Sequence, residues 1–187
     1  MLDKLHNFRL MLLIIIIPIL FSCATNQQKQ EESRDADFYI KRGVAFCEKG
    51  QYDQAIADYN KALEINPRYA EAYNNRGISY GEKGQYDQAI SNYNKALEID
   101  PRYAEAYYNR GNAYSRKGQY DQAISDYTRA LEINPRDAGA YKNRGVAYYF
   151  KREYEKSWND VKKAQSLGYQ IHPKFLDQLR KASGRQN

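Results

Sequence analysis

Cysteine, histidine and tryptophan are scarce in this 187-residue chain, which holds two cysteines, two histidines and one tryptophan. Its histidines, cysteines and carboxylates form no cluster with the spacing of metal ligands, and no glycine-rich phosphate-binding loop occurs. We therefore expect no metal, no cofactor and no enzymatic activity. The net charge of +6 is a mild excess that is diagnostic of no partner. No platform of aromatic and basic residues indicates nucleic acid binding.

Long apolar runs are also lacking, with the exception of residues 10–21, LMLLIIIIPILF, which follow Lys4 and Arg9. As a helix this run spans about 18 Å, whereas a bilayer core needs about 20 apolar residues. Its length is therefore typical of a signal-peptide core rather than of a membrane span. Pro18 also argues against a long continuous helix. An uncleaved membrane anchor is the alternative.

The segment Leu20-Phe21-Ser22-Cys23 resembles the lipobox of bacterial lipoproteins, although Phe21 is bulkier than the residue usual there. The resemblance implies a diacylglyceryl group on the Cys23 thiol, cleavage before Cys23 and acylation of the new N-terminus. Because residue 24 is Ala rather than Asp, it also implies the outer membrane, facing the periplasm. A disulfide between Cys23 and Cys47 in an oxidising compartment is the alternative for these thiols. We predict a signal peptide over residues 1–22 and a lipidated cysteine with a polar tether over residues 23–35.

Tyrosine, in contrast, is very abundant at 19 residues, and a residue type so over-represented indicates reuse at fixed positions of a repeat. From residue 36 onward the chain consists of four successive units of equal length, and residues 70–103 and 104–137 are identical at 24 of 34 positions. Other columns hold aromatic residues, alanine or proline, and one column of glycine runs through Gly43, Gly77, Gly111 and Gly145.

This pattern resembles the tetratricopeptide repeat, in which aromatic residues and glycine precede a series of alanine, aromatic residue, alanine and proline. Each unit is expected to form an antiparallel helix pair, because a missing side chain at Gly77 between Tyr73 and Tyr80 leaves a socket for a second helix. The resemblance implies an all-α fold, a right-handed α-solenoid of four units. Their predicted bounds are 36–69, 70–103, 104–137 and 138–171.

Two further columns carry structural expectations. Gly50, Gly84 and Gly118 suit the left-handed residue that ends a helix, and Arg152 stands in their place in the fourth unit. Arginine occupies a position where leucine is usual in this family, at Arg42, Arg76, Arg110 and Arg144. We interpret these arginines as structural, with stems that cover apolar surface and heads that reach solvent or an acidic neighbour.

The chain after the fourth unit, residues 172–187, is predicted to be a capping helix and a tail. Pro173 suits a first helical turn, and Phe175, Leu176, Leu179 and Ala182 lie on one helical face. The second helix of the fourth unit has drifted from the pattern, as expected of an end repeat that packs against something other than a repeat.

The first-helix positions opposite the packing stripe differ from unit to unit. In tetratricopeptide proteins this face lines a concave groove that binds partners, so the resemblance implies a protein or peptide partner here. Drift on solvent-facing positions is the alternative. An asparagine ladder, Asn75, Asn109 and Asn143, could hold an extended peptide backbone, since amides both donate and accept. The candidate groove residues are Ile40, Val44, Cys47, Asn74, Asn75, Ile78, Tyr108, Asn109, Asn112, Lys142, Asn143, Val146, Tyr149 and Phe150.

We therefore predict a lipid-anchored interaction scaffold of the bacterial cell envelope that binds a protein in its groove. The alternative is a protein that associates with the cell wall, and with peptidoglycan in particular, through its basic C-terminal end. Residues 136–187 hold twelve lysines and arginines against five acidic residues. A solvated helical face is the simpler interpretation of that charge. Cys47 is expected to be a small, partly buried residue rather than a reactive thiol.

Overall fold

The computed structural model describes residues 35–185, which form a row of antiparallel α-helices without any strand among them. The first described helix covers residues 35–48. The helices that follow are α2 (Tyr52–Ile65), α3 (Ala70–Glu82), α4 (Tyr86–Ile99), α5 (Ala104–Arg116), α6 (Tyr120–Ile133), α7 (Ala138–Phe150), α8 (Tyr154–Ser166) and α9 (Pro173–Ser183).

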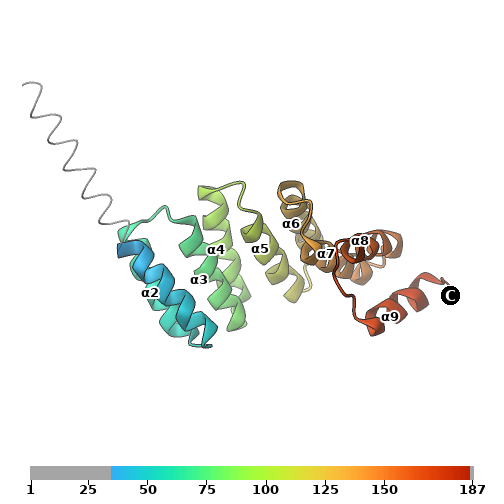
Figure 1. Cartoon of the computed structure of the whole chain (residues 1–187), viewed down its shortest axis with the longest axis horizontal. Helices are drawn as coiled ribbons and strands as arrows, with labels where there is room; N and C mark the ends of the chain where they lie inside the picture. The colour runs from blue at the N-terminus through green and yellow to red at the C-terminus, as the bar shows by residue number, and fades with distance from the viewer. Residues whose placement is uncertain (1–34, 186–187) are drawn as a thin grey trace, which may run out of the picture.

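Each helix packs against the next one along the chain, so that the molecule is an elongated stack with its two described ends far apart (Figure 1). The pairs α3 with α4, α5 with α6 and α7 with α8 are the predicted second, third and fourth units. The first helices of neighbouring units, α3, α5 and α7, also contact one another. The predicted solenoid of helix pairs is thus confirmed for the described part of the chain.

A glycine–tyrosine contact sets how closely the two helices of a unit approach. A Cβ atom added to Gly77 would lie 2.6 Å from Cε1 of Tyr93, and one added to Gly111 would lie 2.8 Å from Cε1 of Tyr127. Both rings are buried. Because interiors are close-packed, only a residue without a side chain leaves room for such a ring. Gly43, Gly77 and Gly111 therefore have the predicted structural role.

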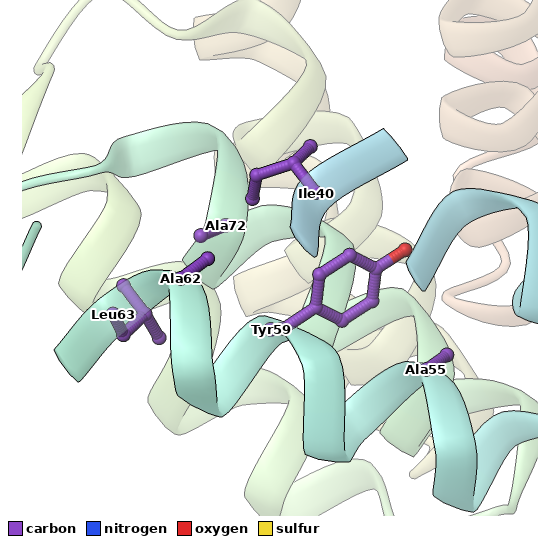
Figure 2. Close-up of a cluster of buried hydrophobic side chains, with 6 residues drawn as sticks. All are labelled: Ile40, Ala55, Tyr59, Ala62, Leu63 and Ala72. Carbon is purple, nitrogen blue, oxygen red and sulfur yellow. The ribbon is translucent and has the colours of Figure 1, made fainter. Parts of the chain in front are cut away.

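The core runs through the stack rather than residing in separate units. Figure 2 shows the ring of Tyr59 from α2 beneath Ile40 of the first described helix, with Ala62 and Ala72 beside them. Ala72 belongs to α3, the next unit, and is fully buried. A single unit would leave this surface exposed to water, so neighbouring units are needed to complete each core cluster.

The turns within and between units follow the sequence signals. Gly50, Gly84 and Gly118 have φ angles of 71, 72 and 73°, and Arg152 is the one non-glycine residue among residues 35–185 with positive φ, at 62°. Left-handed backbone costs a residue with a Cβ atom more than it costs glycine. Between units, the side chain of Asp100 accepts a hydrogen bond from the backbone N–H of Arg102 at 2.9 Å, which closes the turn around the intervening proline.

The arginines in place of leucine join neighbouring helices. Arg110 donates from Nε and Nη2 to both carboxylate oxygens of Asp126, at 2.8 and 2.7 Å. It also donates from Nη1 to Asn94 Oδ1 of the preceding unit at 2.6 Å. Arg144 repeats this arrangement with Asp160 and Thr128. The predicted acidic neighbour is confirmed for Arg42, Arg110 and Arg144. The guanidinium groups of Arg110 and Arg144 also connect two units, a role that their bidentate geometry suits.

Helix α9 continues the register of the repeat. Lys83, Lys117 and Lys151 each form an ion pair with the aspartate 30 residues earlier, and Arg185 donates to Glu155 at the same separation, with 2.5 Å between Nη2 and Oε2. Phe175 follows Tyr141 by one repeat length, as an aromatic residue of a fifth unit would. Helix α9 therefore occupies the place of a first helix, with the fully buried Leu179 where the other units have glycine.

Candidate functional site

The inner face of the stack, built mainly by first helices, contains a hollow of about 760 Å³ over the second, third and fourth units. This volume lies within the range of about 300–1,000 Å³ that ligand sites occupy. Seven of the candidate groove residues line it: Ile78, Asn109, Asn112, Lys142, Asn143, Val146 and Phe150. Phe150 is 55% exposed, so its ring is available for contact with a partner.

A second hollow of about 280 Å³ continues the first one toward the N-terminal end. Val44, Cys47 and Asn75 line it, together with Ile78 and Glu82, which also line the larger hollow. The two hollows therefore form one groove along four units. We call the inner surface lined by these two hollows the groove.

Four candidate residues line neither hollow. Ile40 is 4% exposed and packs in the core, and Asn74 is fully buried, so the prediction that both lie on the surface of the groove is wrong. The first helix of the next unit covers this side of each helix. Asn74, for example, accepts a hydrogen bond from Asn109 of that next helix at 3.1 Å. Tyr108 and Tyr149 are partly buried, and the Tyr149 ring lies edge-on to Phe175 of α9 with 5.4 Å between centroids.

The asparagines of the groove form hydrogen bonds with one another. Asn143 Nδ2 donates to Asn112 Oδ1 at 2.8 Å and to the Tyr108 hydroxyl at 3.0 Å. The hydroxyl of Tyr127 donates to the same Asn112 oxygen at 2.8 Å, and Lys142 Nζ donates to Asn143 Oδ1 at 3.0 Å. These bonds connect α5, α6 and α7 and hold the polar floor of the groove in one arrangement, which lowers the entropic cost of binding.

Sequence reasoning missed the tyrosines that the second helices contribute. Tyr52, Tyr86 and Tyr120 are the first residues of α2, α4 and α6, and each lines one of the two hollows. The Tyr120 ring stacks on Phe150 with 4.9 Å between centroids and 6° between planes. Their recurrence at the same position of successive units was visible in the sequence, but it was not connected with the groove because the whole second helix was assigned to packing.

The charges of the groove have opposite signs at its two ends. Glu48 and Glu82 line it at the first and second units, whereas Arg116 and Lys142 line it at the third and fourth. Tyr93, behind the groove, has a pKa raised by burial and further by Glu82. Burial also raises the pKa of Tyr127, and there the cation of Arg116 acts in the opposite direction.

Within the described residues, the basic C-terminal end contains both paired and unpaired cations. Lys151 pairs with Asp121 and Glu153, and Arg180 pairs with Asp177 at 2.8 Å. Arg185 likewise pairs with Glu155. Lys162 and Lys163 are exposed on α8. Both interpretations of this end, a binding surface and a solvated helical face, therefore stay predictions.

The structure places little chemistry elsewhere. Among residues 35–185, no group of three histidines, cysteines or carboxylates is arranged to hold a metal ion. The Cys47 thiol is partly buried beside the Ser79 hydroxyl, with 3.8 Å between sulfur and oxygen. None of the helices within residues 35–185 is long and apolar enough to cross a bilayer. Cys23 and the predicted signal peptide lie outside the described residues.

Comparison with family models identifies the repeat. The model described as "TPR repeat" matches residues 43–84 and 79–118, and the model described as "Tetratricopeptide repeat" matches residues 104–137. Together these matches run from residue 43 to residue 137, about half of the chain. An uncharacterized protein of Methanocaldococcus jannaschii is 41% identical over 39 residues, which is 21% of this chain and 45% of that relative. The match thus spans less than half the length of the relative.

Solved structures share the fold. A crystal structure of MamA aligns with 26% identity and a TM-score of 0.68, over 76% of this chain and 84% of that one. The first TPR of Spaghetti (RPAP3), bound to the HSP90 peptide SRMEEVD, aligns with 27% identity and a TM-score of 0.61, over 63% and 93%. The Arabidopsis OM64 TPR domain aligns with 26% identity and a TM-score of 0.60, over 62% and 96%.

Proposed function

Because the chain belongs to the tetratricopeptide repeat family, we propose that it is an interaction scaffold of the bacterial cell envelope that binds a protein partner in its groove. Proteins of this family are generally interaction scaffolds rather than enzymes. The observation that carries the proposal is the continuous groove along four units, in which preordered amides lie beside an exposed aromatic ring. Concave surfaces with a few convergent polar groups are the usual form of a binding site.

An extended peptide segment is the form of partner that the groove suits. Its polar floor offers hydrogen-bonding groups at Asn109, Asn112 and Asn143, and its rim offers the stacked rings of Tyr120 and Phe150. The structural neighbour from Spaghetti is bound to a seven-residue HSP90 peptide, which supports a peptide ligand for the fold.

Photocrosslinking in cells tests the binding surface. A crosslinking amino acid at Phe150 or at Val44, which is 36% exposed, should capture the same protein, because both positions line the groove. Ser91 on α4 is exposed and lines neither hollow, so it is the matched control and should capture nothing specific. Capture at Ser91 alone would show that the partner binds elsewhere. Co-sedimentation of the protein with purified cell-wall sacculi, without any captured protein, would favour the peptidoglycan-binding alternative.

For the location, we propose that Cys23 carries the lipid and that the protein is anchored to the outer membrane, facing the periplasm. The lipobox-like segment and Ala24 support this proposal. More than one acyl chain is needed for stable anchoring, because each buried CH₂ contributes about 0.8 kcal/mol. Residues 23–35 would then act as a polar tether that holds the groove away from the lipid surface.

Metabolic labelling with a fatty-acid analogue tests the anchor. Wild-type protein should be labelled and should fractionate with outer membranes, whereas Cys23→Ala protein should be unlabelled and should accumulate with its signal peptide attached. The control Cys47→Ala should be labelled like the wild type. Equal labelling of wild type and Cys23→Ala would contradict the proposal. Phe21→Ala should speed processing, because a smaller residue is usual at that position of the lipobox.

A further inference from the structure

The charged residues of the groove are arranged in repeat order. Glu48, Glu82 and Arg116 follow one another at intervals of one repeat length and lie at the C-terminal end of the first helices of three successive units. The sign of the charge thus changes once, between the second and third units. Lys142 of the fourth unit adds a second positive charge on the same side of this change.

These groups are uncompensated, in contrast to their sequence neighbours. Lys83 and Lys117, each next to one of these residues, form ion pairs with Asp53 and Asp87 across units. Within residues 35–185, Glu48, Glu82 and Arg116 are exposed and take part in no ion pair. Lys142 donates only to the neutral Asn143 side chain. The charges are therefore available to a ligand.

The pKa values of three buried tyrosines that line the two hollows depend in part on these charges. Burial raises the pKa values of Tyr59 and Tyr93, and Glu48 and Glu82 respectively raise them further. At Tyr127, Arg116 opposes the effect of burial. Other carboxylates also raise the pKa values of these three tyrosines, so the change of sign along the groove rests on the positions of Glu48, Glu82, Arg116 and Lys142 in the two hollows.

We propose that the groove fixes the orientation of a bound extended peptide through this charge separation, an inference that rests on the proposed function. An acidic residue of the peptide lies against Arg116 and Lys142, and a basic residue lies against Glu48 and Glu82. An apolar residue next to the acidic one packs on the Tyr120–Phe150 stack, which lines the same hollow as the two cations. Complementary charge of this kind mainly sets specificity and orientation.

The spacing of the two peptide charges follows from helix packing. The first helices of neighbouring units contact each other directly, and packed helices lie about 8–10 Å apart. An extended chain advances about 3.3 Å per residue. One unit of the solenoid therefore corresponds to about three residues of peptide. A basic residue about three positions from the acidic residue meets Glu82, and one about six positions away meets Glu48.

A fluorescent peptide series tests the proposal with the intact protein. Each probe has an apolar and serine background with one glutamate and one lysine, three or six positions apart, and carries a photocrosslinker beside the glutamate. Binding is measured by fluorescence anisotropy at low salt, where exposed charges are least screened. Wild type should bind these probes about tenfold more tightly than probes with two lysines or two glutamates, and the crosslinks should map to α5 and α7.

Charge reversal provides the decisive variants. Arg116→Glu with Lys142→Glu should weaken binding of the mixed probe about tenfold and should make the groove prefer the two-lysine probe. The control Lys162→Glu with Lys163→Glu changes the net charge equally, away from the groove, and should leave affinity unchanged. If the partly buried Lys142 does not tolerate the change, Arg116→Glu alone should act in the same direction to a smaller extent.

Reversal of all four groove charges gives the sharpest outcome. With Glu48→Lys, Glu82→Lys, Arg116→Glu and Lys142→Glu together, affinity for the mixed probe should return, and the crosslinks beside the glutamate should move to the first described helix and α3. Crosslinks that stay on α5 and α7 would overturn the orientation proposal. Loss of cellular crosslinks at both Phe150 and Val44 would instead overturn the proposed function. Retained cellular capture with no charge dependence would overturn this inference alone.

Discussion

Arg76 donates a hydrogen bond from Nε to Oδ1 of Asn92 at 2.7 Å, in the position where the other three units pair the arginine with an aspartate. Its second partner, Asn60 of the preceding unit, is also neutral, at 2.5 Å from Nη1. Burial lowers the pKa of Arg76. Among residues 35–185 no carboxylate forms an ion pair with Arg76, so the second unit holds a partly buried cation with neutral partners.

We expect Asn92→Asp to stabilise the protein. The substitution turns a hydrogen bond in which only Arg76 is charged into an ion pair with a second charged partner, and partial exposure limits the gain. The free energy of unfolding, measured by urea denaturation, should rise by about 0.5–1 kcal/mol. The reciprocal control Asp126→Asn should lower it by a similar amount, since it removes the carboxylate from Arg110. A lower stability of Asn92→Asp would show that Arg76 is already compensated.

Arg152→Gly should also stabilise the protein, because Arg152 adopts a φ angle of 62° that its three counterparts satisfy with glycine. Relief of left-handed strain is worth about 0.5–1 kcal/mol. The backbone hydrogen bond from Arg152 N–H to Tyr149 O, at 2.9 Å, does not need the side chain. Thermal unfolding should show a higher midpoint for Arg152→Gly, and a lower one for the matched control Gly118→Arg. No change in Arg152→Gly would indicate that its side chain contributes as much as the strain costs.

Gly77→Ala and Gly145→Ala should differ in their cost. A Cβ atom at Gly77 would lie 2.6 Å from the ring of Tyr93, whereas one at Gly145 would meet its nearest neighbours at 3.3 Å or more. Overpacking costs about 1–3 kcal/mol, and alanine regains up to about 1 kcal/mol of helix propensity. Chemical denaturation should therefore show a clear loss for Gly77→Ala and a near-neutral result for Gly145→Ala. Equal losses would mean that the Val161 environment of the fourth unit is as tight as the tyrosine sockets.

The repeat made most of the fold predictable, because the same residue types recur at equivalent packing positions in successive units. Gly77 and Tyr93 occupy the same repeat positions as Gly111 and Tyr127. A close glycine–tyrosine contact inferred for one unit therefore predicted how the two helices pack in several units. The C-terminal capping helix was predicted, but its correspondence to the first helix of a further unit was not. Leu179 stands where glycine is expected, and no second helix follows it among the described residues to require a glycine.

The candidate groove was only partly predictable, since a helical wheel gives a direction but not the neighbour in that direction. Asn109 and Val146 were placed correctly beside the hollow. Ile40 and Asn74 lie on nearly the same face but are buried by contact between adjacent first helices, which depends on how steeply the units are stacked. Tyr120 lines the groove although it is the first residue of a second helix. Its place there follows from the packing of the units in space, which the periodicity of its own helix does not predict.

Alkaline pH should destabilise the fold through its tyrosines. A hydrogen bond to the Asp37 carboxylate raises the pKa of Tyr69 from its ordinary value of 10.0 to about 12. Because the folded pKa is raised, the stabilisation is fully present below pH 10.0 and is lost as the pH rises toward about 12. Burial shifts Tyr59, Tyr93, Tyr103 and Tyr127 in the same direction.

Ultraviolet titration of tyrosinate, together with urea denaturation at several pH values, measures this dependence. The free energy of unfolding should fall between pH 10.0 and about 12, and a late-ionising class of tyrosines should appear. In Asp37→Asn, the Tyr69 hydroxyl should ionise nearer its ordinary value, and the loss of stability over this interval should be smaller. A single titration near the ordinary value for all tyrosines would contradict the burial that the structure shows.

The single tryptophan should report on the docking of α9. Trp158 is buried on α8, its indole Nε1 donates to Ser183 Oγ of α9 at 3.1 Å, and Leu179 of α9 is fully buried beside it. The two helices of the fourth unit have neighbouring helices on both sides, whereas α9, which contacts α8 and the Tyr149 ring of α7, lies at the end of the described stack. Terminal segments of this kind open at lower cost than the interior.

Leu179→Ala should therefore undock α9 before the rest of the solenoid unfolds. Removal of a buried leucine side chain costs about 2–5 kcal/mol, which exceeds what a single terminal helix is expected to withstand. Trp158 emission should move to longer wavelength at a urea concentration below the midpoint seen by far-ultraviolet circular dichroism, and the gap between the two transitions should widen relative to wild type. Lys181→Ala, an exposed change on the same helix, should leave both transitions in place. Coincident transitions in Leu179→Ala would show that α9 unfolds together with the four units, as a cooperative part of the stack.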